Sequence, residues 1–148
     1  MKMKSVVPTL FLYLLVGLFA TISNADPGKY PKALVILSSD SVQTQGMAMV
    51  LSNTMQAEGT RVQVLLCDKA GDLALAKKAN SSKLKPINAS PKMLLNKLRK
   101  GGAKTDVCAL YLPNSEYTEA DLEEGVGVAK PPQITAIMLS KDTQVFTF

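Results

Sequence analysis

Residues 32–67, KALVILSSDSVQTQGMAMVLSNTMQAEGTRVQVLLC, decide the fold class of this chain. They open with a continuous apolar run at 32–37, which is typical of a strand buried on both faces of a parallel sheet. Apolar residues at helical spacing then predict a helix over about 42–57, with Gly59 as its C-terminal stop. A second apolar run at 61–67 predicts another buried strand. This order of strand, helix and strand indicates an α/β fold.

Two more helices and a loop are predicted downstream. A short helix is expected over 72–78, and the polar segment 80–89 is expected to form a loop. The clearest helix pattern has Ser90 as its N-cap and Pro91 in the first helical position, and it ends at Gly101. The alternation of strands and helices therefore continues beyond residue 67.

Three further strands complete a predicted five-stranded sheet. Residues 106–112 (DVCALYL) form an apolar run, and the stiff pair of prolines at 131–132 leads into another at 134–139. Residues 143–148 (TQVFTF) alternate like an edge strand, and they follow too closely for a parallel crossover, which needs a dozen or more residues. The predicted fold is a three-layer α/β/α sandwich with a mostly parallel sheet and an antiparallel C-terminal edge strand.

The first 25 residues have the pattern of a secretory signal peptide. Lys2 and Lys4 provide a positive start, residues 6–20 are apolar, and small residues precede a cut expected after Ala25. The apolar run is shorter than the roughly 20 residues that span a bilayer. The mature protein is therefore expected to be one domain of residues 26–148, periplasmic or secreted, with no membrane anchor after cleavage.

The composition excludes several enzyme classes. The 148 residues include no His and two Cys, so they offer no Ser-His-Asp triad and no imidazole-ligated zinc site. Two cysteines cannot build an all-cysteine zinc or iron–sulfur site. The basic stretch 73–105 contains no aromatic residue on which bases could stack, and it is either a solvated face or a rim that attracts anions. We expect no metal, no organic cofactor and no nucleic-acid partner.

Candidate binding residues lie where the predicted strands end. Sites in such sheets form beyond the carboxyl ends of the strands. The serines and the aspartate at 38–41, after the first strand, could equally cap the following helix or contact a ligand. A capping box at 118–121 opens a short helix, and the glycine that closes it begins a close-approach loop. The candidates for substrate binding are Ser39, Asp40, Gln43, Cys67 and Gly125.

The two cysteines allow three interpretations. Cys108 is a small buried hydrophobe, a disulfide partner of Cys67, or a reactive thiol. A disulfide requires Cα atoms within about 7 Å. If the first strand lies between the second and third, the cysteines are too far apart, whereas a bridge is plausible if the second and third strands approach at their ends. Strand order therefore separates these interpretations in part, because it bears on whether the disulfide can form.

Two segments of the chain resemble the DsrE/DsrF/TusD-like family of sulfur-handling proteins. They are residues 98–128, LRKGGAKTDVCALYLPNSEYTEADLEEGVGV, and residues 32–67. The resemblance implies that Cys108 is catalytic and carries sulfane sulfur as a persulfide, with no cofactor. It also implies a homo-oligomer, a trimer or hexamer, and a sulfur donor or acceptor that is a protein or a small sulfur compound. Lys97 or Lys104 is expected to favour the anionic sulfur.

Two other functions remain open. In a non-catalytic oligomeric binding module, the cysteines would be structural, either buried or linked by a disulfide. A thiol–disulfide oxidoreductase would use both thiols, but the chain lacks the Cys-x-x-Cys motif that keeps two thiols in reach.

Overall fold

Five strands form one sheet in the order β4-β3-β2-β1-β5, and every neighbouring pair is parallel. This computed structural model describes residues 31–79 and 82–148. The predicted signal peptide lies outside the described residues, as does the start of the predicted loop at 80–89. Within the described part, the strands are β1 (Lys32–Leu37), β2 (Arg61–Leu66), β3 (Lys104–Val107), β4 (Gly127–Val128) and β5 (Thr143–Thr147).

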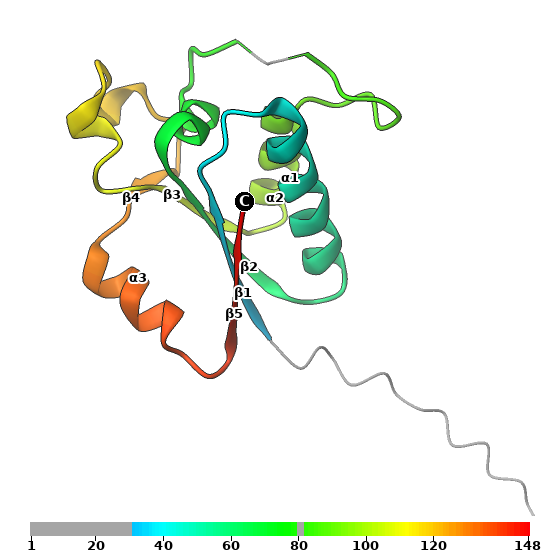
Figure 1. The fold of residues 1–148 in the computed structure, drawn as a ribbon, viewed down its shortest axis with the longest axis vertical. Helices are drawn as coiled ribbons and strands as arrows, with labels where there is room; N and C mark the ends of the chain where they lie inside the picture. The colour runs from blue at the N-terminus through cyan, green and yellow to red at the C-terminus, as the bar shows by residue number, and fades with distance from the viewer. Residues whose placement is uncertain (1–30, 80–81) are drawn as a thin grey trace, which may run out of the picture.

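Helices cover both faces of the sheet (Figure 1). The helices α1 (Val42–Ala57) and α2 (Pro91–Lys100) lie on one face, and the shorter α3 (Pro131–Met138) lies on the other. Of the short 3-10 helices, η1 (Asp68–Ala74) follows β2, and η2 (Leu112–Asn114) and η3 (Glu119–Asp121) lie between β3 and β4. The predicted three-layer α/β/α sandwich is confirmed. None of the helices in the described residues is long and apolar enough to cross a membrane.

The continuous apolar runs of β1 and β2 fill a core on each side of the sheet. Val35 and Val64 are fully buried in the larger core, toward α1 and α2. Leu34 and Leu65 point to the opposite face and pack with Ile134 of α3. Alternate side chains of each strand enter different cores, so both faces of the sheet are buried. The unbroken apolar runs predicted this burial on both faces.

Local capping places the two long helices where the sequence predicted them. The Ser41 side chain accepts a hydrogen bond from the Thr44 N–H at 3.4 Å and starts α1. Ser90 accepts one from the Met93 N–H at 3.3 Å and starts α2, with Pro91 in the first turn. Both contacts satisfy amide groups that a helix start leaves unpaired.

One predicted strand is wrong, and another has different bounds. Residues 134–139 belong to α3, because the prolines at 131–132 occupy the first helical turn, where a missing N–H costs no hydrogen bond. The predicted strand 106–112 begins earlier, at Lys104, and ends at Val107. There the chain turns, and the Tyr111 N–H donates to the Cys108 carbonyl at 2.9 Å. The short strand β4 was not predicted, and the helix expected at 72–78 is replaced by η1.

The C-terminal strand lies at the edge of the sheet as predicted, but its predicted antiparallel direction is wrong. Lys32 of β1 aligns with Thr143, and the register runs parallel to the end of β5. The crossover that this requires is supplied by α3, which carries the chain from β4 back across the open face. Misassigning α3 as a strand had removed that crossover from the prediction.

Candidate functional site

A disulfide joins Cys67 and Cys108 at the carboxyl edge of the sheet. Leu66 of β2 aligns with Val107 of β3, so the residues that follow these strands, Cys67 and Cys108, lie side by side. The Cα atoms are 5.0 Å apart, and the Cys108 N–H donates to the Leu66 carbonyl at 2.8 Å. The strand order thus satisfies the condition that allows a bridge, because β3 neighbours β2 directly.

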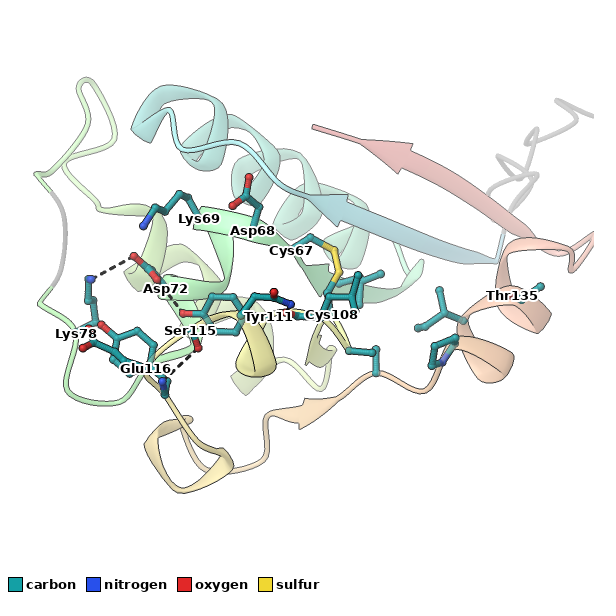
Figure 2. A pocket seen from close by; sticks show the side chains of 18 residues that line it. Cys67, Asp68, Lys69, Asp72, Lys78, Cys108, Tyr111, Ser115, Glu116 and Thr135 are labelled. Carbon is teal, nitrogen blue, oxygen red and sulfur yellow. Dashed lines mark hydrogen bonds and ion pairs between the residues drawn. A yellow bond between two sulfur atoms is a disulfide. The ribbon is translucent and has the colours of Figure 1, made fainter.

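This disulfide forms part of the wall of a pocket with a volume of about 890 Å³. Both cysteines are half-buried. One side of the pocket is apolar, built by Leu65, Ala109, Leu110, Ala129, Pro131 and Ile134. The other is polar, built mainly by Asp68, Lys69, Asp72, Lys78, Ser115 and Glu116. Figure 2 shows the disulfide between these two sides, with Asp72 and Lys78 at one end and Thr135 of α3 at the other.

A hydrogen-bonded cluster around Asp72 organises the polar side. The Tyr111 hydroxyl donates to Asp72 Oδ1 at 2.8 Å, and Lys78 Nζ lies 3.2 Å from Asp72 Oδ2. The Lys78 ammonium also lies 5.9 Å from the centroid of the Tyr117 ring. Burial, and then the hydrogen bond to Asp72, raise the pKa of Tyr111. The hydrogen bond to the Asp72 carboxylate, followed by its charge, raises the pKa of Lys78. Tyr111 is therefore neutral and Lys78 charged at pH 7.

A buried lysine fixes the segment that follows η1 and carries Lys78 to the pocket. Lys92 of α2 is 5% exposed, and its ammonium donates to the carbonyls of Leu75 at 2.5 Å and of Lys78 at 3.0 Å. Its charge is balanced by Glu123, whose Oε1 lies 3.2 Å away. A buried ammonium is stable when carbonyls and a carboxylate satisfy it in this way.

The structure separates the predicted site residues into two groups. Cys67 and Cys108 meet in the pocket, whereas Ser39, Asp40 and Gln43 precede or begin α1 and do not line it. The Ser39 hydroxyl accepts a hydrogen bond from a nearby backbone N–H, which is a local turn contact. A role of these three side chains in substrate binding stays a prediction.

Gly125 also lies outside the residues that line the pocket. Its φ of +79° belongs to the left-handed region that favours glycine, and the Arg99 guanidinium donates to the neighbouring Glu124 carbonyl. Lys104 begins β3 at the opposite edge of the sheet and pairs with Asp106 at 3.1 Å. The lysines that line the pocket are Lys69 and Lys78 instead.

Sequence reasoning missed the pocket residues Asp72, Lys78 and Tyr111. A signal existed in their spacing, because Asp72 follows Cys67 by five residues and Tyr111 follows Cys108 by three. This spacing places Asp72 and Tyr111 near each other only because β2 and β3 are neighbours and β3 ends at Val107.

Comparisons with known proteins identify the fold. No protein-family model matches the chain, and no curated protein matches its sequence. Among solved structures, the ychN protein from E. coli superimposes with a TM-score of 0.66 at 14% identity, over 80% of this chain and 99% of that one. The protein MTH1491 from Methanobacterium thermoautotrophicum matches with a TM-score of 0.56 at 15% identity, over the same shares of the two chains. The chain therefore has a DsrE-like α/β fold, the fold of the E. coli protein.

Proposed function

We propose that this protein takes up sulfane sulfur on Cys108 as a persulfide and passes it to an acceptor thiol, with Cys67 as the partner thiol of the site. One observation carries the proposal: the Cys67–Cys108 bond forms part of the wall of a pocket, and both cysteines are only half-buried. Small reagents can reach sulfur atoms in this position. The DsrE-like fold gives the same proposal independent support.

The cycle begins with reduction, because neither sulfur of a disulfide is a nucleophile. An external dithiol opens the bond and is itself oxidised to a disulfide. The Cys108 thiolate then attacks the terminal sulfur of a persulfide donor. A bond forms between Cys108 Sγ and that sulfur, the sulfur–sulfur bond of the donor breaks, and the donor leaves as a thiolate.

The persulfide on Cys108 has two possible fates. The thiolate of an acceptor can attack the terminal sulfur, which moves to the acceptor while Cys108 leaves as a thiolate. Alternatively, the Cys67 thiolate can attack Cys108 Sγ, so the disulfide forms again and the terminal sulfur leaves as hydrosulfide. In the second route, the two thiolates supply the two electrons that reduce the sulfane sulfur. The disulfide is then the discharged form of the site.

A matched pair of variants tests the proposal. Cys67→Ser removes the competing thiol, so incubation with inorganic polysulfide should add one sulfur atom to Cys108, measured by intact mass and peptide mapping. Cys108→Ser should gain no sulfur on Cys67. An acceptor thiol should then remove the added atom. Equal sulfur uptake by both variants, or uptake by neither, would contradict the assignment to Cys108.

The second candidate is a non-catalytic oligomeric binding module with a structural disulfide. The observation that favours it is the position of the bond, which ties the ends of two neighbouring core strands together. On this alternative, the folded protein resists reduction by dithiols, and Cys67→Ser takes up no sulfur. The same mass measurements therefore distinguish the two candidates.

Export and self-association belong to the same proposal. The protein is proposed to act as a homo-oligomer in the periplasm or outside the cell, after removal of residues 1–25. N-terminal sequencing of the exported protein should begin at Asp26, and light scattering after gel filtration should give a trimer or hexamer mass. A protein retained with an intact N-terminus would contradict the export proposal, and a monomer mass would contradict self-association.

A further inference from the structure

The strand register places Cys67 and Cys108 side by side, and we propose that the hydrogen bond between Tyr111 and Asp72 is a noncovalent clasp that holds the turns after the two cysteines in position when the disulfide is open. Tyr111 and Asp72 are then positioning residues for the sulfur chemistry. The inference rests on the proposed function, because it requires the two cysteines to form a reversible pair.

Each cysteine begins a short turn that leads directly to one half of the clasp. The Cys67 carbonyl accepts a hydrogen bond from the Ala70 N–H at 3.1 Å, which starts η1 and leads to Asp72. The Cys108 carbonyl accepts one from the Tyr111 N–H at 2.9 Å. Tyr111 is therefore one tight turn from Cys108, and Asp72 lies five residues from Cys67 within η1.

The clasp and the disulfide are two separate links between the same two segments, the one that follows β2 and the one that follows β3. The Tyr111 hydroxyl donates to Asp72 Oδ1 at 2.8 Å, and Lys78 holds the other oxygen of that carboxylate at 3.2 Å. Figure 2 shows Tyr111 extending from the disulfide toward Asp72. Opening the sulfur–sulfur bond leaves this second connection in place. The two turns thus remain joined in the dithiol form.

The packing around the clasp requires a glycine at position 71, beside the Tyr111 ring. Tyr111 is 8% exposed, and its ring lies against Gly71, where any Cβ atom would collide with the ring carbons. The ring therefore has a fixed position from which its hydroxyl reaches Asp72. A hydrogen bond to a carboxylate is stronger than one between neutral groups, so it is well suited to hold two segments without a covalent bond.

The effect of the clasp can be measured as the effective concentration of the Cys67 thiol near the Cys108 thiol in the dithiol form. If the clasp orders the dithiol form, its loss lets the two turns move apart, and the disulfide becomes less favourable relative to an external disulfide. A purely structural contact that stabilises the dithiol and disulfide forms equally would leave this equilibrium unchanged.

The test is the equilibrium of the folded protein with mixtures of reduced and oxidised glutathione, measured by alkylation and intact mass. Tyr111→Phe keeps the ring and removes only the hydroxyl, and it should lower the equilibrium constant for disulfide formation about three- to tenfold. Asp72→Asn should lower it in the same direction. The double variant should lower it no further than the more affected single variant, because both remove one contact.

Asp142→Asn is the matched control. Asp142 pairs with Lys32 at the opposite edge of the sheet, 3.8 Å away, and its change to Asn should leave the constant unaltered. Near-ultraviolet circular dichroism of the disulfide form establishes that each variant is folded, and Asp72→Asn decides the test if Tyr111→Phe does not fold. Constants within about twofold of the wild type in the folded clasp variants would overturn the proposal.

The outcome is independent of sulfur transfer, because no persulfide donor is present in the glutathione measurement. If the constant falls but Cys67→Ser takes up no sulfur, the clasp stands and the persulfide proposal fails. If sulfur is taken up while the constant stays unchanged, the persulfide proposal stands and the clasp fails.

Discussion

Opening the Cys67–Cys108 disulfide should destabilise the fold by about 4 kcal/mol. The bond has a sequence separation of 41 residues. Closing a loop of that length removes about 13 cal/mol/K of entropy from the unfolded chain, which corresponds to about 4 kcal/mol at 25 °C. For a domain of this size, the melting temperature should fall by about 15 °C. The protein should nevertheless remain folded, because the buried residues of its two cores include neither cysteine, and both cysteines only pack against their margins.

The assay is guanidinium unfolding of the wild type with and without a dithiol reductant, beside the double variant Cys67→Ser and Cys108→Ser. The double variant should match the reduced wild type, and reductant should not change its stability. Free energies must be compared as well as midpoints, because an unfolded chain without the cross-link exposes more surface and has a larger m-value. If the fully reduced wild type is as stable as the disulfide form, the entropy argument is refuted.

Three further predictions concern the residues around the pocket. Lys92→Met leaves the Glu123 carboxylate and backbone carbonyls without their ammonium partner, and it should cost about 3 kcal/mol in denaturant unfolding, whereas Lys97→Met on the exposed side of the same helix should cost little. Gly71→Ala places a Cβ atom against the Tyr111 ring and should cost about 1–3 kcal/mol, and full stability in the same assay would show that the ring moves freely. Burial and its hydrogen bond raise the pKa of Tyr111 in the folded state, so this contribution to stability is fully present below pH 10, the ordinary pKa of tyrosine, and is lost as the pH rises toward the folded-state value. Tyr111→Phe should therefore flatten the alkaline loss of stability in urea titrations above about pH 10, and an unchanged slope there would contradict the cause assigned to it.

The parts of the fold that depend on local chemistry were predictable from the sequence. The bounds predicted for β1 and α1 match the structure because the apolar run and the cap at Ser41 act within a few residues. The apolar segment of α3 was assigned to a strand because a run this short has no periodicity that separates a buried strand from a helix. The prolines before it were interpreted as a linker, although proline is equally suited to the first turn of a helix.

The candidate site was predictable only in part, because its contacts are not local. Cys67 and Cys108 could be assigned to strand ends, but their contact depends on whether β2 and β3 are neighbours. Tyr111 was assigned to a strand that in fact ends at Val107. The turn that begins at Cys108 redirects the tyrosine toward η1, and no pattern within residues 106–112 indicated that turn.

The accessibility of the disulfide follows from register, strand alternation and the shortness of α3 together. Leu66 and Val107 are aligned and both point into the larger core, so the next residue in each chain points to the opposite face. On that face, α3 buries only Ile134 of its eight residues, and the pocket remains open beyond its N-terminal end. The fact that β2 and β3 are neighbours would therefore not by itself place both cysteines at the pocket. A shift of one residue in the register would place one sulfur in the core and the other in the pocket, whereas the observed alignment places both cysteines at the same pocket.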